Sequence, residues 1–205
     1  LSSYFEIEKK IDDNTNFSTK VRLYEDLSKD SSDKYQYIFP DFNFSKEIEL
    51  DESYNGQFNF SSTGFQKIHN TNVYETLINN DFNFESYDFT SSNGIVTDYS
   101  FLLKNYNTYS ENSSIYEEKN DHEIFGTFLL KSELPLKKDL DDNNNFLKPI
   151  AQIRFSPTNG KDISASGSRM DYASIFSPNR IGRADMVEKG KSLTIGLEFE
   201  KQNFE

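Results

Sequence analysis

Apolar and polar residues alternate without a break in the stretch Leu193-Thr194-Ile195-Gly196-Leu197-Glu198-Phe199-Glu200. Each odd position is apolar, and each even position is small or charged. Because successive side chains of a β-strand point to opposite faces, this period of two places all the apolar side chains on one face of a strand. The same alternation recurs at residues 17–23, 58–60, 82–85, 99–104 and 151–155. The pattern predicts an all-β protein.

Short segments rich in Asn, Asp, Ser and Gly separate the alternating runs, for example at 12–14, 29–33, 91–94 and 139–145. These residues favour turns because they tolerate left-handed backbone or hydrogen-bond to their own backbone. Strands joined in series by such turns form hairpins, so we expect an antiparallel up-and-down meander in which each strand pairs with its chain neighbour. The expected strands are 3–11, 16–25, 34–49, 53–63, 71–87, 94–109, 122–134, 147–156 and 192–203.

Several of these runs reach about ten residues, which is the length of a tilted strand that crosses a bilayer. Their polar positions carry amide and charged side chains, which suit water better than a packed core. These side chains are Lys20, Arg22, Asn83, Glu85, Lys104 and Arg154. A transmembrane β-barrel has this arrangement, with lipid outside and a wet interior. A soluble β-sandwich with one wet face on each sheet predicts the same alternation, so both architectures stay open at this point.

Composition narrows the class of protein. The chain has 205 residues, a formal net charge of -12 and no Cys. The acidic balance argues against binding to a nucleic-acid backbone, and the lack of Cys excludes disulfides, Cys metal ligands and a Cys nucleophile within this sequence. No apolar run approaches the roughly 20 residues of a transmembrane helix. An aromatic content of 15% argues against disorder.

The longest segment without alternation runs from Ser156 to Lys191. A loop of this length in a compact domain is usually functional or disordered. Basic and acidic residues stand close together in it, which predicts an ordered, paired loop: Arg169, Arg180 and Arg183 lie near Asp171, Asp185 and Glu188. Bacterial barrels have short periplasmic turns and long extracellular loops. The loop is therefore expected on the extracellular side, with the option of folding into the lumen.

Sequence signatures of catalysis or metal binding are missing. His69 and His122 are isolated, so we expect an exposed or lumen-facing role for each. The acidic run 139–145 lacks the fixed Gly and the terminal Glu of an EF-hand loop. Glu117 and Glu118 are adjacent and would point to opposite faces of a strand, so they cannot act as an acid–base pair. There is no nucleophile elbow and no phosphate-binding glycine loop. We expect no enzyme activity and no cofactor.

Motifs in the C-terminal third of the chain resemble a known family. They are Leu147-Lys148-Pro149, Arg154-Phe155-Ser156-Pro157, Ile175-Phe176-Ser177-Pro178-Asn179-Arg180-Ile181-Gly182, and then Asp185, Glu188 and Gly190. Their order and spacing resemble the barrel domain of the LptD family, the lipopolysaccharide-assembly proteins of the outer membrane, also called organic-solvent-tolerance proteins. Upstream segments at 22–27, 39–44, 72–75, 103–107 and 134–138 are similar too, so the resemblance covers nearly the whole chain.

The resemblance implies that residues 1–205 are an internal portion of a large antiparallel barrel in the bacterial outer membrane, with a long loop at about 157–191. The whole protein would transport lipopolysaccharide and insert it into the outer leaflet. An LptE-type lipoprotein would plug the barrel, and an N-terminal domain outside this sequence would join the periplasmic Lpt bridge. As a fragment, the chain is expected to form an open, curved sheet. The interacting molecules would be lipopolysaccharide and membrane lipid, with no nucleic acid.

The family motifs also nominate the site residues, which are Pro149, Arg154, Ser156, Pro157, Asn179, Arg180, Gly182, Asp185, Glu188 and Gly190. They would shape the lumen and the long loop, either by contact with lipopolysaccharide or only by fixing the loop. In the second interpretation Pro157 and Pro178 set φ, Gly182 turns the chain, and Arg180 pairs with Asp185. A porin or receptor barrel and a soluble β-sandwich binding module remain the alternative classes.

Overall fold

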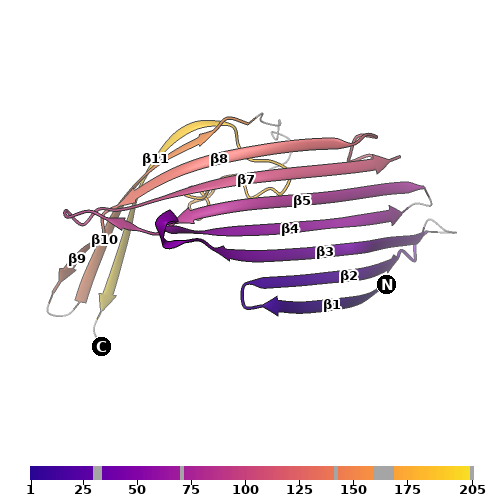
Figure 1. Cartoon of the computed structure of the whole chain (residues 1–205), viewed down its shortest axis with the longest axis horizontal. Helices are drawn as coiled ribbons and strands as arrows, with labels where there is room; N and C mark the ends of the chain where they lie inside the picture. The colour runs from indigo at the N-terminus through magenta and orange to yellow at the C-terminus, as the bar shows by residue number, and fades with distance from the viewer. Residues whose placement is uncertain (30–33, 70–71, 141–142, 159–168, 204–205) are drawn as a thin grey trace. The chain divides into compact units, whose positions relative to one another are not determined.

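The computed structural model describes residues 1–29, 34–69, 72–140, 143–158 and 169–203. These residues form antiparallel strands and one short 3-10 helix, η2 (Glu52–Tyr54). Figure 1 shows the strands, of which the short β6 is not labelled. Their bounds are β1 Ser2–Asp12, β2 Thr15–Glu25, β3 Tyr35–Glu49, β4 Gly56–His69, β5 Val73–Ser86, β6 Phe89–Thr90, β7 Val96–Glu111, β8 Asp121–Glu133, β9 Leu136–Asp139, β10 Asn143–Ser156 and β11 Gly190–Asn203.

The strands pair in chain order, as the turn pattern predicts. The order in the sheet is β1-β2-β3-β4-β5-β7-β8-β10-β11, with the short β6 paired to β7 and β9 paired to β10. The sheet is an open antiparallel meander, so the predicted fold class is confirmed. No second sheet is present in the described residues, which rules against the β-sandwich for this part of the chain.

Two differences from the expected strands have local causes. The strand expected at 53–63 begins later, because 52–54 form the 3-10 turn η2, and it runs on through Gly64 to His69. Gly64 therefore lies inside a strand and does not end it. A Cβ at Gly64 would lie 2.5 Å from the carbonyl oxygen of Leu77 and 2.8 Å from the ring of Phe42. Only glycine allows this close approach of neighbouring strands.

The chain divides into two compact units. Unit 1 comprises Leu1–Glu49, Phe58–Asn83 and Leu103–Ile124, and unit 2 comprises Leu50–Gln57, Phe84–Leu102 and Phe125–Glu205. No helix in the described residues is long and apolar enough to cross a membrane. In each unit, the alternation of the sequence separates one apolar face of the strands from one polar face.

The polar face of unit 1 carries ion pairs between neighbouring strands. Lys20 lies 2.7 Å from Glu6, and Arg22 pairs with Asp41. The apolar face presents exposed aliphatic and aromatic residues, among them Phe5, Ile7 and Val21. Rings also line up across strands on that face: Phe60 lies 5.9 Å from Phe44 and 4.7 Å from Phe82, between ring centroids.

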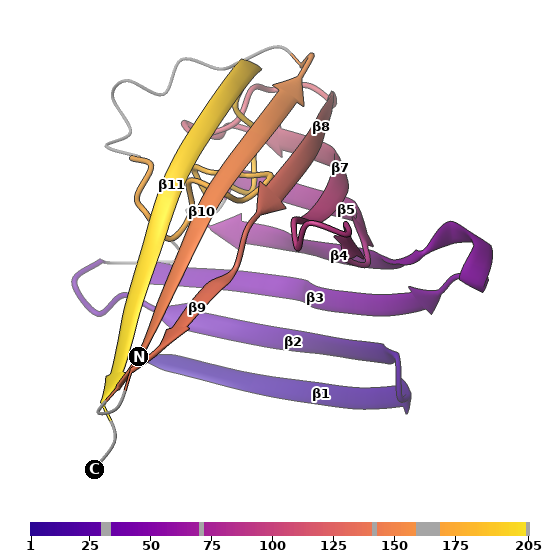
Figure 2. The same cartoon turned by 90° about the vertical axis from the view of Figure 1, so that its left-hand side faces the viewer.

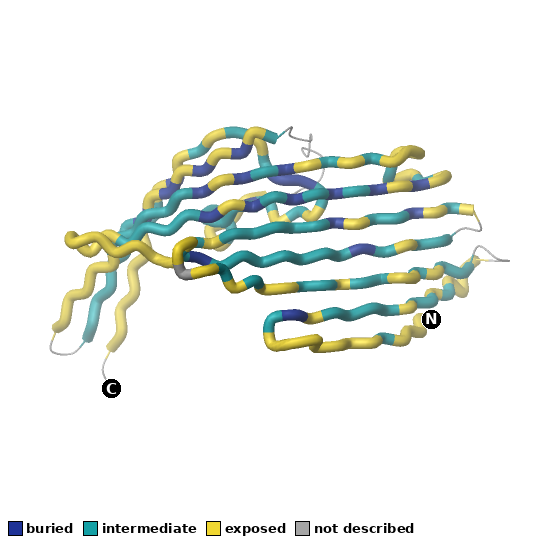
Figure 3. The backbone as a smooth tube through the Cα atoms, viewed as in Figure 1, coloured by how far each residue is buried: buried dark blue, intermediate teal, exposed yellow. Residues whose placement is uncertain are grey.

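Unit 2 shows the same separation most clearly along β10 and β11. Residues on one face are exposed and apolar: Ile153, Phe155, Leu193, Ile195, Leu197 and Phe199. Ile195 is 76% exposed, and together these six residues form an exposed apolar patch of a kind that is uncommon on monomeric soluble proteins. The intervening residues of β10, Gln152, Arg154 and Ser156, are buried on the opposite face. Figure 3 shows buried and exposed positions alternating along β7, β8 and β10.

The polar face of unit 2 is not polar throughout, contrary to the simple expectation of a wet surface. Four of its strand residues, Leu102, Phe125, Leu129 and Ile150, are buried apolar side chains. Met186 and Val187, from the connection between β10 and β11, are buried as well. The connection between β10 and β11 therefore covers a partly apolar surface of the sheet.

Candidate functional site

The described part of the β10–β11 connection, residues 169–189, lies against the polar face of unit 2, and we call it the docked loop (Figure 2). Arg154 of β10 holds it. The Nε of Arg154 donates to the carbonyl oxygen of Pro178 at 3.0 Å, and its Nη2 donates to the carbonyl oxygen of Glu188 at 2.8 Å. Nη2 also lies 3.4 Å from Oγ1 of Thr127. The side chain is 1% exposed, so it joins the middle of the docked loop, at Pro178, and its C-terminal end, at Glu188, to the sheet.

A second arginine closes the docked loop on itself. Arg180 binds the carboxylate of Glu188 with both arms of its guanidinium, through Nε at 2.9 Å and Nη2 at 2.7 Å. Arg183 binds Asp185 in the same two-armed manner at 2.7 Å. Two-armed arginine–carboxylate pairs are among the stronger and more directional polar contacts in proteins. The prediction that the loop is paired is therefore confirmed for Arg180 and Arg183.

One predicted ion pair is wrong. The interpretation in which the motif residues only fix the loop pairs Arg180 with Asp185, but Arg180 binds Glu188, and Asp185 binds Arg183. The cause is a turn after Asn179. The amide nitrogen of Gly182 donates to both the carbonyl and the side-chain oxygen of Asn179, each at 3.2 Å. Gly182 has φ +69, a left-handed value that favours glycine. This turn reverses the chain and leads residue 188 back to Arg180.

The remaining motif residues occupy two different places. Ser156 ends β10, where it pairs with Gly190 at the start of β11 and donates to the carbonyl oxygen of Gly126 at 2.9 Å. Gly190 has φ +117, which again favours glycine. Pro157 follows as an exposed residue. Pro149 lies nearer the start of β10, where it pairs with Leu197 of β11.

Some residues of the site were not nominated by the motifs. Phe176 of the docked loop sits over Gly196 of β11, and a Cβ on that glycine would lie 2.6 Å from the ring. The sequence does carry a signal for this contact, because Gly196 is the only position without a side chain in the alternating stretch 193–200. Gln152 is 1% exposed, and neither atom of its side-chain amide has a hydrogen-bond partner within the described structure. Its place on the polar face follows from the alternation in β10.

A groove of about 310 Å³ adjoins the docked loop. It lies in unit 2, between strand residues and the loop residues Phe176 and Pro178. Three carboxylates line it, from Glu85, Asp88 and Asp98, together with the amine of Lys131. Lys131 pairs with Asp98 at 3.1 Å. Among the described residues the groove is therefore acidic in balance, and the amine of Lys131 is already in an ion pair.

Asp171 organises the exposed start of the docked loop. Its side chain accepts a hydrogen bond from the amide nitrogen of Ser174 at 2.8 Å, and its carbonyl oxygen accepts one from the amide of Ile175 at 3.0 Å. The hydrogen bonds from the backbone and hydroxyl of Ser174 lower the pKa of the Asp171 carboxyl below its ordinary value. The carboxylate is therefore the form that stabilises this turn.

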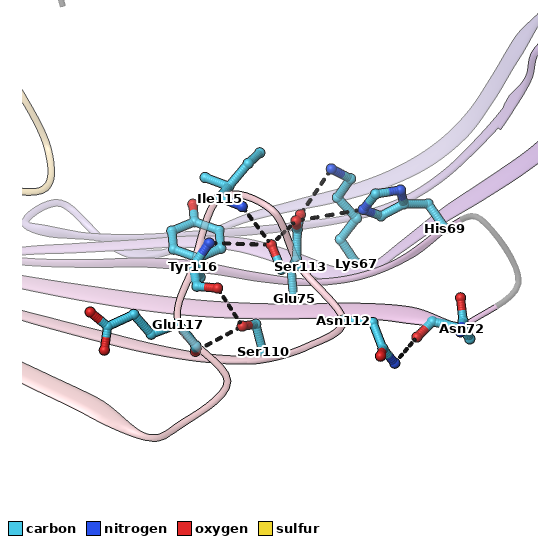
Figure 4. Close-up of polar contacts among 10 residues, drawn as sticks. All are labelled: Lys67, His69, Asn72, Glu75, Ser110, Asn112, Ser113, Ile115, Tyr116 and Glu117. Carbon is cyan, nitrogen blue, oxygen red and sulfur yellow. Dashed lines mark hydrogen bonds and ion pairs between the residues drawn. The ribbon is translucent and has the colours of Figure 1, made fainter. Parts of the chain in front are cut away.

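Unit 1 holds a similar arrangement where the β7–β8 connection meets the polar face (Figure 4). Glu75 of β5 is 2% exposed. Its carboxylate accepts from Lys67 at 2.9 Å and from the hydroxyl of Ser113 at 2.7 Å, and His69 lies 3.5 Å away. Ser113 belongs to the β7–β8 connection, so Glu75 fixes that connection to β4 and β5.

Neither histidine stands in a metal-binding group. The described residues contain no group of three or more His, Asp or Glu placed to hold a metal ion. His69 faces Glu75, and the Nδ1 of His122 lies 2.8 Å from the Oδ1 of Asn107. What the geometry offers is two connections held against a polar surface by the buried charged residues Arg154 and Glu75.

A family model described as "LptD: LPS transport system D" matches residues 2–200. The chain belongs to the LptD family. Members of the LptD family are β-barrel proteins of the outer membrane that transport lipopolysaccharide, and they are transport proteins rather than enzymes. No curated protein matches the chain. The family resolves the choice of class that the alternation left open, because it excludes the soluble sandwich and the general porin or receptor.

Proposed function

We propose that this chain forms part of the wall of the LptD barrel, with its polar face toward the lumen and its apolar face toward the bilayer. The lumen would pass the sugar part of lipopolysaccharide while the acyl chains leave into the outer leaflet. The observation that carries the proposal is the exposure of the apolar face. Side chains such as Ile195 and Phe199 are exposed, and a barrel in lipid is the setting in which such a face is stable.

The polar face supports the other half of the proposal. Its charged groups are paired between neighbouring strands, as in Lys104 with Asp81 at 2.6 Å. In unit 1 an open groove on this face is lined by Glu8, Asn16, Ser18, Asn43 and Ser45 among others. Hydroxyl, amide and carboxylate groups of this kind form hydrogen bonds with water and with sugar hydroxyls. The acyl chains of lipopolysaccharide would not be stabilised by the polar groups that line this groove.

Arg154, Arg180 and Glu188 would then act by positioning the docked loop inside the lumen. All the hydrogen bonds found for Arg154 join the sheet to itself or to the loop, which favours a positioning role over contact with lipopolysaccharide in this arrangement. By the same reasoning Asn179 and Gly182 would shape the turn of the docked loop, and Gly190 would begin β11 opposite Ser156. An LptE-type lipoprotein inside the barrel and a connection to the periplasmic Lpt bridge complete the proposal, and both are supported by the family alone.

The orientation of the two faces can be tested with neighbouring residues. In the full-length protein in its native outer membrane, cysteine would be placed at Ile7 or Glu8 on β1, and at Ser18 or Val21 on β2. We expect Glu8→Cys and Ser18→Cys to react with a charged, water-soluble thiol reagent. Ile7→Cys and Val21→Cys should react only with a lipid-soluble one. The parent protein supplies the background signal. Equal reactivity of the two faces with the charged reagent would contradict the proposal.

A further inference from the structure

A chain of polar side chains crosses the apolar face of unit 1. The hydroxyl of Ser62 on β4 donates to Asn80 on β5 at 2.7 Å, and Asn80 donates to Asn105 on β7 at 3.1 Å. The amide of Asn107 donates to Asn105 at 2.7 Å. Its oxygen lies 2.8 Å from the Nδ1 of His122 on β8. We call these five residues the Asn–His stripe.

The stripe belongs to the apolar face, not to the polar one. Asn79 and Asp81, the neighbours of Asn80 in sequence, both contact Lys104 on the opposite side of the strands. Residues at a spacing of two from the stripe are apolar and exposed: Ile78 precedes Asn80, Tyr109 follows Asn107, and Ile124 follows His122. The stripe therefore interrupts a surface that the proposed function turns toward lipid.

Polar groups facing hydrocarbon are costly unless they are hydrogen-bonded. Hydrogen bonds within the stripe satisfy only part of its polar groups. Asn80 and Asn105 each carry two N–H groups, and within the described contacts each donates a single hydrogen bond. Both amides keep an N–H group for an acceptor that does not come from the described residues. Departures from local pattern rules of this kind are expected at functional positions.

The stripe lies toward the end of unit 1 that carries the longer connections. At this end the connections after β2 and β7 each span nine residues and the one after β4 spans three, whereas at the opposite end the β1–β2 turn spans two and the β3–β4 connection spans six. Long connections of bacterial barrels face outside. Asn105 and Asn107 lie in the half of β7 nearer its longer connection, and His122 begins β8 just after it. The part of the stripe on β7 and β8 therefore lies toward the outer leaflet.

On the basis of the proposed function, we propose that the Asn–His stripe binds the acyl-linkage region of lipopolysaccharide in the outer leaflet, on the outside of the barrel wall. The members of the stripe are amides, a hydroxyl and an imidazole, with no lysine or arginine among them. Such groups match carbonyl and hydroxyl acceptors, as found where acyl chains join the sugar, better than they match a phosphate, which favours Arg or Lys. Lipopolysaccharide that the protein has delivered lies in the outer leaflet, which is the leaflet that the stripe faces.

The test is photo-crosslinking in cells that express the full-length protein. A benzophenone amino acid would replace Ile78, which lies beside the stripe and leaves it intact. Phe58, on the same face of unit 1 but away from the stripe, is the control position. We expect a lipopolysaccharide adduct at Ile78 that is much weaker at Phe58. Adding Asn80→Leu and Asn105→Leu should lower the yield, by about five- to tenfold for each hydrogen bond lost. Asn43→Leu on the polar face should leave it unchanged.

Each outcome decides between specific failures. An adduct at Ile78 that is unaffected by Asn80→Leu and Asn105→Leu, or one formed with phospholipid in place of lipopolysaccharide, would overturn the stripe as a site. Phe58 would then still form lipid adducts, and the proposed orientation would stand. If neither position forms an adduct with any lipid, the orientation itself fails. Retained heat-modifiable mobility in gel electrophoresis would show that the variants fold.

Discussion

Replacing Arg154 with methionine removes the charged contact between β10 and the docked loop while keeping a similar aliphatic length. Arg154 donates to two loop carbonyl oxygens, those of Pro178 at 3.0 Å and Glu188 at 2.8 Å. Hydrogen bonds from a charged donor contribute about 1.5–3 kcal/mol each. Burying the guanidinium when the loop docks costs several kcal/mol, which offsets part of this gain. We therefore expect docking to weaken by about 2 kcal/mol, or roughly 30-fold in the docking equilibrium.

Hydrogen exchange on the full-length protein in lipid nanodiscs measures this change. Amides of residues 170–189 that docking protects should exchange about 30-fold faster in Arg154→Met, because their exchange follows the local opening equilibrium. Amides in the β-ladders should keep their rates, since the substitution removes no ladder hydrogen bond. Arg154→Lys should give an intermediate result, because an ammonium keeps the charge but loses the fixed fork of donors.

Arg22→Met is the matched control, because Arg22 lies on the polar face and pairs with Asp41 of the adjacent strand. Its loss should leave exchange in 170–189 unchanged. The reasoning would be refuted if Arg154→Met also left that exchange unchanged, or if it accelerated exchange equally in the loop and the strands. The second result would mean that Arg154 stabilises the whole sheet and does not position the loop.

Three further outcomes follow from local geometry. Gly64→Ala should lower the free energy of unfolding in detergent by about 1–3 kcal/mol, because its Cβ meets a backbone carbonyl; Gly126→Ala, where the space is open, should change it by less than about 0.5 kcal/mol. Gly196→Ala should displace the ring of Phe176 and speed exchange in the docked loop, but less than Arg154→Met, since a flexible side chain can move. The pKa of Asp171 is lowered from 3.8 in the folded loop, so its contribution is complete above that pH and is lost as the pH falls through the lower folded value. Loop exchange, corrected for the intrinsic pH dependence, should therefore rise below about pH 3.8 in the parent protein but not in Asp171→Asn.

The sequence predicts the two faces of the strands well, because a period of two leaves no freedom in which side a residue takes. The same reasoning predicts the strand order, since short turns can join only neighbouring antiparallel strands. It fails for β6 and β9, which are too short to show a period. It also fails at the C-terminal end of the strand expected at 53–63, which runs on through Gly64 to His69.

The candidate site is predicted in part for a related reason. Charge proximity predicts that the loop is paired, but not which charges pair, because the turn at Asn179–Gly182 decides which residues meet. That turn brings Glu188 to Arg180 and leaves Asp185 to Arg183. The alternation predicts that Arg154 lies on the polar face. It does not predict the hydrogen-bond partners of Arg154, because they are main-chain carbonyls and carry no sequence signature.

In the Asn–His stripe, alternation alone does not predict which residue lies on which face, and the energetic cost of burying each side chain decides. Lys104 and Asn105 are adjacent and both polar, so one of them must lie on the apolar face. Lys104 faces Asp81, which offers a carboxylate, and Asn105 takes the apolar side with Asn80. A charge left among lipid chains costs more than a neutral amide, and amides on successive strands can satisfy one another. The residues that a lipid-facing wall can hold for recognition are therefore neutral ones that hydrogen-bond across strands, and these are the residues found here.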